Sequence, residues 1–193
     1  MGSEATPLRE KLIQAAIAVF AEHGYNGTTV DDIVQAAGSS KGAFYFYFPN
    51  KEGLFLALVE DFATGLVRAI ADAVEKSTGA LAKVEAALAA GVRAFGRDRA
   101  LSKIMLVEAV GLNPAFEGKR REIYARFAAL IQSYLDKAVA DGDIPPMNTE
   151  MMAYAWLGAI TEVVVHWLET GRPENLEAVV PDLARFTIKG LRG

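Results

Sequence analysis

Residues 28–52 read TTVDDIVQAAGSSKGAFYFYFPNKE, and this stretch predicts two short helices joined by a tight turn. The hydroxyls of Thr28 and Thr29 are suited to cap the free backbone N–H groups at the start of the first helix. Gly38 ends that helix, because glycine tolerates the positive φ of an abrupt helix terminus. Pro49 ends the second helix, since proline has no N–H to continue it. This helix-turn-helix is the arrangement whose second helix enters the DNA major groove.

The second helix of the pair has an inner and an outer face. Phe44 and Phe48, four residues apart, are expected to pack inward against Ile33 of the first helix. Tyr45 and Tyr47 then point outward or sideways, where tyrosine hydroxyls donate well to phosphate oxygens. This outer face favours a DNA partner, although the same spacing also fits an ordinary helical hairpin inside an all-α domain.

The wider segment 8–55 resembles the DNA-binding domain of the tetracycline-repressor (TetR) family of bacterial transcription regulators. The resemblance rests on an Ala-rich first helix followed by TTVDDI, the AAG turn, SKGAFYFYF and FPNKE, in the family's order and spacing. Two residues depart from the family pattern: Ser39 stands where a small apolar residue is usual, and Phe46 stands where His or Tyr is frequent. The resemblance implies a dimeric DNA-binding regulator, and Phe46 means that its operator sequence cannot be borrowed from relatives.

The expected DNA contacts are grouped around the second helix and the ends of its neighbours. Lys41, Ala43 and Tyr45 are expected to touch base edges or the adjacent sugar–phosphate. A two-fold dimer predicts a near-palindromic operator with half-sites about one helical turn, or a multiple of it, apart. The whole predicted DNA-binding set is Thr28, Thr29, Ser39, Ser40, Lys41, Gly42, Ala43, Tyr45, Phe46, Tyr47 and Lys51, of which Thr28, Ser40, Tyr47 and Lys51 are expected to grip phosphates.

The charge of this segment predicts only a modest electrostatic attraction for DNA. Residues 1–51 hold four Lys or Arg and five Asp or Glu, in a chain whose formal net charge is −4. A DNA-binding module usually presents a basic face, so Lys41 and Lys51 are expected to lie near phosphates while the acids face away. So few cations also predict a shallow dependence of DNA affinity on salt.

Composition and motifs argue against an enzyme. The chain has no Cys and only two His, and neither a phosphate-binding glycine loop nor a Ser/His/Asp set in a nucleophile-elbow context is present. We therefore expect no catalytic residue, no metal site and no cofactor. The most apolar run, residues 153–168, is interrupted by Glu162 and His166 and is short for a bilayer. A cytoplasmic protein without a membrane partner is expected.

The pattern beyond residue 50 is helical, so the expected fold class is all-α. A three-helix helix-turn-helix module over residues 1–52 is expected to precede a larger effector-binding and dimerisation domain over residues 53–193. Apolar periodicity and Gly/Pro breaks give the boundaries of the elements. Helices are expected over residues 51–76, 80–97, 101–110, 116–140, 149–169 and 174–191.

The helix expected over residues 149–169 is apolar on nearly every face, so it must be covered on every face. A partner subunit is the natural cover in a domain of this size, although the helix could also centre the core of a monomer. The family resemblance implies a four-helix bundle made by the last two helices of each subunit. The expected interface residues are Tyr154, Gly158, Glu162, Val165, Val179, Leu183 and Phe186.

A small-molecule site is less visible in the sequence. Aromatic and Met residues recur at helical spacing in the larger domain, a pattern that fits either a ligand cavity or plain core. The resemblance implies a small, often apolar effector in this domain. Because the candidate lining holds few polar groups, we expect a largely apolar effector such as a fatty-acyl compound. An all-α carrier of apolar ligands and a DNA-organising protein without an effector remain alternatives. The candidate pocket residues are Phe62, Leu66, Phe95, Met105, Phe116, Tyr124, Phe127, Tyr154 and Trp156, with Arg93, Arg97, Arg99 and Lys103 as candidates for an anionic head group.

Overall fold

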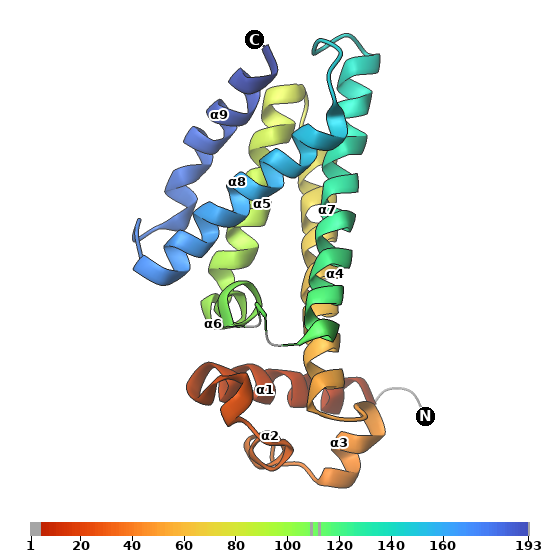
Figure 1. Ribbon diagram of the computed structural model, residues 1–193, viewed down its shortest axis with the longest axis vertical. Helices are drawn as coiled ribbons and strands as arrows, with labels where there is room; N and C mark the ends of the chain where they lie inside the picture. The colour runs from red at the N-terminus through yellow and green to blue at the C-terminus, as the bar shows by residue number, and fades with distance from the viewer. Residues whose placement is uncertain (1–4, 109, 112, 193) are drawn as a thin grey trace. The chain divides into compact units, whose positions relative to one another are not determined.

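The computed structural model describes residues 5–108, 110–111 and 113–192, and within these ranges it contains helices and no strand. The all-α prediction is confirmed (Figure 1). The elements are α1 (Ala5–Gly27), α2 (Val30–Ala36), α3 (Lys41–Tyr47), α4 (Lys51–Glu75), α5 (Ala80–Arg97), α6 (Arg99–Lys103), a π-helical turn (Ile104–Glu108), α7 (Pro114–Ala140), α8 (Thr149–Thr170), a 3-10 turn (Leu176–Val179) and α9 (Val180–Arg192).

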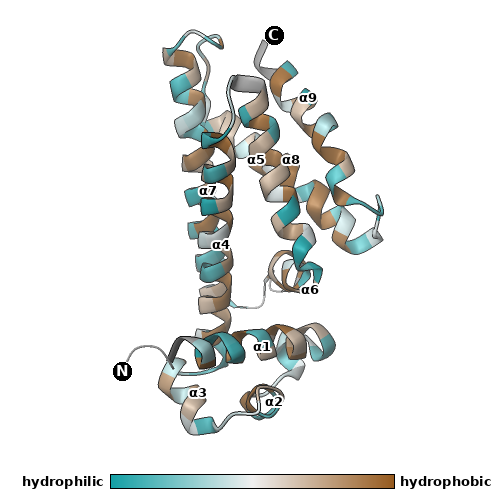
Figure 2. Cartoon of the chain, turned by 180° about the vertical axis from the view of Figure 1, so that it is seen from behind, coloured by the Kyte–Doolittle hydropathy of each residue, from teal (hydrophilic) through white to brown (hydrophobic). Residues whose placement is uncertain are grey.

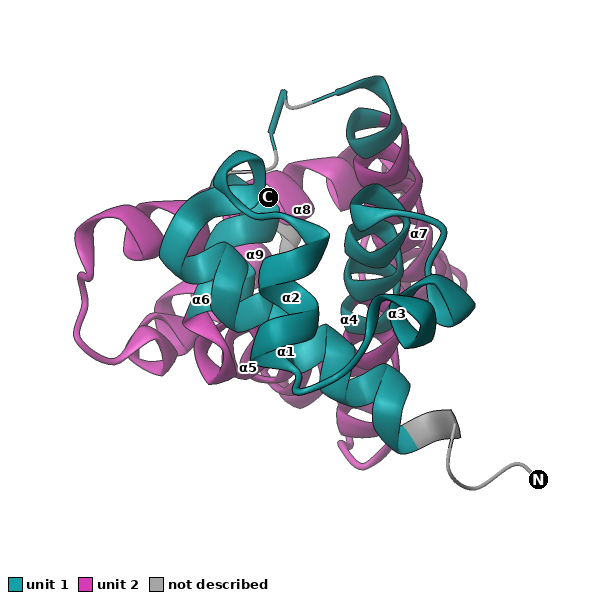
Figure 3. Ribbon diagram, turned by 90° about the horizontal axis from the view of Figure 1, so that it is seen from below, with its two compact units in different colours: residues 1–62, 100–117 teal, residues 63–99, 118–193 magenta. Residues whose placement is uncertain are grey.

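The chain forms two compact units (Figure 3). Unit 1 comprises Met1–Phe62 and Ala100–Glu117, and unit 2 comprises Ala63–Arg99 and Gly118–Gly193. This division differs from the expected boundary at residue 52. The first half of α4 belongs to unit 1 because its apolar face is buried in the core of that unit, and the segment 100–117 returns to the same core.

The core of unit 1 is built around a cluster of aromatic rings. Phe20 and Tyr25 of α1 lie 5.5 Å apart between ring centroids, and Phe55 of α4 lies 5.3 Å from Tyr25. Phe116 completes the cluster at 4.5 Å from Phe55 and 5.0 Å from Tyr25. Because each fully buried aromatic side chain contributes about 1.5–3 kcal/mol, this cluster holds α1, α4 and the start of α7 together.

A break in α1 turns the chain toward the helix-turn-helix. Gly24 adopts φ 71° and ψ 165°, which lies outside the helical region, so α1 is kinked there. Such a φ is strained for a residue with a Cβ. The turn that follows brings Thr28 back beneath α1, and α2 and α3 then pack against it through Ile33, Val34 and Phe44.

Two apolar clusters of unit 2 can be followed among the described residues. In one, Trp156 and Ala153 of α8 pack with Ala128 and Leu135 of α7. In the other, Leu88 of α5 packs with the start of α9, which carries Leu183 and Ala184. The clusters show why α5, α7, α8 and α9 occupy one unit although they are far apart in sequence.

Two expected helices differ from the observed ones. The segment expected as one helix over 101–110 is α6 followed by the π-helical turn, and residue 109 lies outside the described residues. The final helix was expected from residue 174, but α9 begins at Val180 and the 3-10 turn precedes it. Pro181 explains the later start: its missing N–H and fixed φ suit the first turn of a helix and not its interior.

The α8 helix is apolar, as expected (Figure 2). Its side chains are not all covered within one chain. Met151 and Tyr154 are 54% and 43% exposed, while Val164 and Trp167 are buried. By length and composition α8 could cross a membrane, a test that core helices of water-soluble proteins also pass. Only 28% of its most apolar stretch is buried inside the chain.

Candidate nucleic-acid interface

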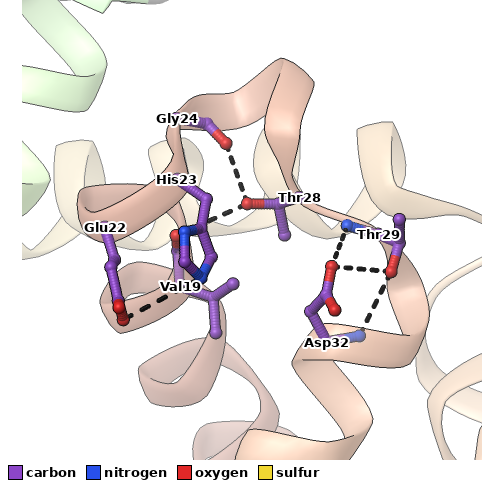
Figure 4. Close-up of polar contacts among 7 residues, drawn as sticks. All are labelled: Val19, Glu22, His23, Gly24, Thr28, Thr29 and Asp32. Atoms are coloured by element: carbon purple, nitrogen blue, oxygen red, sulfur yellow. Dashed lines mark hydrogen bonds and ion pairs between the residues drawn. The ribbon is translucent and has the colours of Figure 1, made fainter.

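The helix-turn-helix in unit 1 follows the capping rules of its sequence. Thr29 caps α2 and forms a reciprocal capping box with Asp32: its hydroxyl accepts from the Asp32 N–H at 3.2 Å, and the Asp32 carboxylate accepts from the Thr29 N–H at 2.8 Å (Figure 4). Ser40 caps α3 by accepting from the Ala43 N–H at 3.2 Å. Gly38, with φ 55°, closes α2 as expected.

The α3 helix presents a sharply divided surface. Phe44 is fully buried in the core of unit 1, as is Phe48 just beyond the helix. Tyr45 and Phe46 are 54% and 77% exposed, and Gly42 is exposed as well. No acidic residue occurs in α3, so nothing on this helix repels a phosphate.

Lys41, the first residue of α3, is already paired within the unit. Its Nζ lies 2.8 Å from the Asp31 carboxylate of α2, and both side chains are mostly exposed. The hydrogen bond to Asp31 and the charge of that residue raise the pKa of Lys41. Lys41 is therefore held as a cation beside α3, where a DNA phosphate or base would have to compete with Asp31. The sequence analysis did not predict this ion pair. Its signal was the helix-turn-helix itself, which brings the start of α2, with Asp31, near the start of α3, with Lys41.

Thr28 was expected to grip a phosphate, and the structure corrects this. Thr28 is only 1% exposed, and its hydroxyl donates to the Gly24 carbonyl at 2.8 Å (Figure 4). The Gly24 carbonyl lies in the last turn of α1, and the N–H four residues on, that of Thr28, donates to the Tyr25 carbonyl instead, so the hydroxyl takes its place. Thr28 therefore stabilises the α1–α2 turn and is too deeply buried to touch DNA.

The Thr29 side chain is also used inside the unit. Besides accepting from the Asp32 N–H, its hydroxyl donates to the Asp32 carboxylate at 2.7 Å (Figure 4). The hydrogen bonds from the Thr29 hydroxyl and N–H lower the pKa of Asp32. A single hydroxyl has one proton, so a DNA contact by Thr29 would require this bond to break.

Lys51 was expected at a phosphate, but in the structure its ammonium group turns back into unit 1. It donates to the Tyr25 carbonyl at 2.6 Å and to the Thr28 carbonyl at 2.7 Å, and it lies 4.3 Å from the centre of the Tyr25 ring. Burial lowers the pKa of Lys51. A positive charge at the first residue of a helix is repelled by the positive end of the helix dipole. This unfavourable position was the sequence signal that the Lys51 ammonium needs acceptors of its own. Lys51 thus ties the start of α4 to the end of α1.

The other expected DNA residues lie at or near the exposed side of α3. Ser40, Lys41, Gly42, Tyr45 and Phe46 are exposed. Ser39, Ala43 and Tyr47 are partly buried. These residues, and not Thr28 or Lys51, make up the surface that we call the α3 surface.

The candidate pocket residues belong to different packing groups. Three of them lie in unit 1: Phe116 is in its aromatic cluster, and Phe62 and Met105 pack against the same core. In unit 2, Trp156 is in the α7–α8 cluster, whereas Tyr154 is exposed. The Phe116 ring packs against Tyr25 and Phe55, and its assignment to a pocket stays a prediction. The remaining candidates in unit 2 are Leu66, which is buried, and Phe95, Tyr124 and Phe127, which are partly buried.

Two of the basic residues considered for an anionic head group have partners in unit 2. Arg93 lies 3.5 Å from the Glu177 carboxylate. The Arg99 guanidinium donates to the Trp167 and Leu168 carbonyls at 3.3 and 3.0 Å and stacks over the Trp167 ring at 4.8 Å. Arg99 therefore satisfies carbonyls at the C-terminal end of α8.

The expected interface residues of α8 and α9 differ in exposure. Tyr154, Gly158 and Glu162 are exposed on α8, and Phe186 of α9 is 64% exposed. Leu183 is a correction, because it is buried against Leu88 inside the same chain. The other two expected residues, Val165 and Val179, are partly buried.

No group of three or more His, Asp or Glu side chains suited to a metal ion occurs among the residues that the structure describes. The polar groups of unit 1 described above are helix caps, the Lys41–Asp31 ion pair and the hydrogen bonds from Lys51 to two carbonyls.

Comparison with known proteins gives a consistent set of similarities. The pattern of the family described as "Bacterial regulatory proteins, tetR family" matches residues 12–58, which span α2, α3 and parts of α1 and α4. The transcriptional repressor KstR2 of Mycolicibacterium smegmatis is 27% identical over 194 residues, covering 98% of this chain and 93% of that protein.

Solved structures with the same fold include two fatty-acid regulators. FadR of Bacillus halodurans, a fatty acid degradation regulator, superposes with a TM-score of 0.88 at 26% identity and covers 95% of this chain and 99% of its own. FadR of Bacillus subtilis, solved in complex with stearoyl-CoA, gives a TM-score of 0.87 at 22% identity, with 95% and 99% coverage. The second similarity concerns the fold alone.

Proposed function

Because the chain belongs to the TetR family of bacterial regulatory proteins, we propose that it represses transcription by binding operator DNA through α3 and is released by a small, largely apolar effector. It is a DNA-binding transcription regulator. The observation that carries the proposal is the α3 surface: an acid-free helix whose inner side is core and whose outer side exposes aromatic and hydroxyl groups and one lysine.

The polar groups of the α3 surface are suited to distinct tasks on DNA. Lys41, once it leaves Asp31, supplies charge to a phosphate or a hydrogen bond to guanine. Tyr45 and Tyr47 carry hydroxyls that donate to phosphates, and the Ser40 hydroxyl retains its proton while its oxygen caps α3. With Thr28 and Lys51 committed inside unit 1, we expect few phosphate contacts and a shallow salt dependence.

A homodimer is the second part of the proposal. Apolar side chains on α8 and α9 are exposed in the single chain, with Met151, Tyr154 and Phe186 between 43% and 64% exposed. A Cβ added at Gly158 would meet no described atom within 4 Å, so a second helix has room to approach there. A soluble protein seldom leaves such a surface bare. A second copy of the chain covers it and sets the spacing of two α3 helices.

The effector is proposed to be a fatty-acyl compound. Two structural relatives are named as FadR fatty-acid regulators, and one was solved with stearoyl-CoA. In this chain, unit 2 offers partly buried aromatic residues, and α4 contributes its second half to the same unit. Binding that shifts α4 would change the separation of the α3 helices in a dimer. An effector of this kind alters DNA affinity by its preference between the two states, typically about 5- to 150-fold.

A mobility-shift titration tests the function. The DNA is the region upstream of the protein's own gene, and the titration is repeated with long-chain acyl-CoA and with free coenzyme A as the matched control. We expect a specific shift that acyl-CoA reverses and coenzyme A does not. A protein that binds acyl-CoA but no DNA would be an apolar carrier, whereas a shift that no acyl compound reverses would indicate a DNA-organising protein. The proposed site of action is the bacterial cytoplasm, where DNA and acyl-CoA meet.

A further inference from the structure

Phe46 is an exposed apolar side chain, and packing inside the chain does not explain a phenylalanine at this position. It is 77% exposed, more than any other large hydrophobic residue among the described positions. Its ring touches that of Tyr47 edge-on, with 4.9 Å between centroids and 89° between the planes. An exposed phenylalanine gains little from burial in its own chain, so the orientation that Tyr47 gives it is available to a partner.

Phe46 shares its direction with Gly42, one helical turn earlier. On a helix, residues four apart lie on one face, and this pair lies opposite the buried Phe44. A glycine in a helix is less favourable than an alanine, because it loses more backbone freedom on folding. Within the chain nothing requires it: a Cβ at Gly42 would have the Ser40 Oγ, 3.9 Å away, as its nearest described neighbour. The glycine therefore leaves open the space beside the Phe46 ring for something outside the chain.

The chemistry of the major groove decides what this face fits. A benzene ring has no hydrogen bond to offer, and contact with a phosphate would leave that phosphate without a donor. The base edges in the groove are donors and acceptors, with one apolar group among them, the C5-methyl of thymine. The face is continuous with Lys41 and Tyr45, which the proposed function places on DNA.

We propose that Phe46 is a specificity-determining residue that reads a thymine in each half-site by packing against its C5-methyl group, with Gly42 allowing the backbone to approach. The proposal rests on the proposed function, since it requires α3 to enter the major groove. It also supplies a positive reason for the departure from His or Tyr at this position: the phenyl ring replaces a polar contact by an apolar one.

The test removes methyl groups from DNA one at a time. An operator is first selected from random duplexes with the wild-type protein, and each thymine pair related by the two-fold is then replaced by deoxyuridine, which lacks only the C5-methyl. Since one buried methyl corresponds to about a four-fold change in affinity, we expect wild-type affinity to fall about 15-fold at one thymine pair. For Phe46→Ala the same replacement should change affinity by less than about two-fold.

Controls separate reading from folding and assembly. Because Phe46 is exposed, Phe46→Ala should keep the melting temperature and sedimentation behaviour of the wild type. Tyr134→Ala, which removes an exposed aromatic ring of α7, should retain full sensitivity to deoxyuridine. Equal sensitivity in wild type and Phe46→Ala, or no sensitive thymine at all, overturns the assignment. Failure to select any duplex instead overturns the proposed function, and a changed oligomeric state in Phe46→Ala would assign the ring to a protein contact.

Discussion

Replacing Lys51 by Met separates two roles for this residue. Methionine keeps most of the apolar stem and removes the ammonium that donates to the Tyr25 and Thr28 carbonyls at 2.6 and 2.7 Å. If Lys51 ties α4 to α1, the substitution destabilises unit 1. If Lys51 were a phosphate contact, the substitution would leave stability unchanged and weaken binding to every DNA sequence alike.

The structure sets the size of the expected loss. A hydrogen bond to a charged group contributes about 1.5–3 kcal/mol when it is buried. Lys51 is partly exposed, so water screens both bonds and replaces part of each after the substitution. The Tyr25 carbonyl also keeps the Thr28 N–H at 3.4 Å. We therefore expect Lys51→Met to lower the free energy of unfolding by about 2 kcal/mol in total.

Two measurements decide between the roles. Urea unfolding followed by circular dichroism gives the loss of stability, and fluorescence anisotropy with labelled operator between about 50 and 200 mM salt gives the salt slope. Lys76→Met, which removes an exposed lysine near the end of α4, is the matched control. If Lys51 ties α4 to α1, Lys51→Met should lower the free energy of unfolding and leave the salt slope of DNA binding unchanged. A slope reduced by about one unit, with stability equal to that of the control, would refute the reasoning.

The remaining predictions concern α2, α3 and α9. Gly42→Ala should raise helix stability by about 0.5–1 kcal/mol in thermal unfolding yet weaken operator binding in anisotropy, and a tighter complex would contradict the close approach of DNA. Asp31→Asn frees Lys41 from its partner and removes an acid beside the DNA, so the affinity for operator DNA in the same anisotropy assay should rise about two- to five-fold. An unchanged affinity would mean that the ion pair persists on DNA or that Lys41 does not bind DNA. The pKa of Asp32 is lower in the folded chain than in the unfolded chain, so the ionised carboxylate stabilises the fold above the unfolded pKa, and this stabilisation is lost as pH falls through the folded pKa. In acid titrations followed by circular dichroism, the stability of the wild type should therefore drop more than that of Asp32→Asn below about pH 4. Phe186→Glu places a charge on the exposed face of α9 and should yield monomers in sedimentation equilibrium, with weaker operator binding; an intact dimer would move the interface elsewhere.

The helix-turn-helix could be predicted from the sequence because the signals there are local. Caps at Thr29 and Ser40, the positive φ of Gly38 and the stop at Pro49 each act within a few residues, and α2 and α3 have the expected extents. The inward direction of Phe44 also followed from helical spacing. The same spacing placed Tyr45 and Tyr47 away from the core, with Tyr47 only partly so.

The directions of the polar side chains near the motif could not be predicted without the folded chain. A threonine before a helix has the same sequence signature whether its hydroxyl caps that helix, as in Thr29, or turns back to the Gly24 carbonyl, as in Thr28. A lysine at a helix start is likewise free to reach outward or to cap a neighbouring chain segment, as Lys51 does. These choices depend on which carbonyls at the end of α1 each side chain can reach in the folded unit, which no local pattern records.

The division into units was also decided by tertiary packing. Phe116 follows a helix break more than fifty residues after Phe55, yet the two rings lie 4.5 Å apart in the core of unit 1. Leu183 looked like an interface residue but is buried against Leu88 of its own chain. Apolar periodicity predicts that a helix face is buried but not which element covers it. The hydrophobic effect is non-directional, so any partner that excludes water from the face stabilises it.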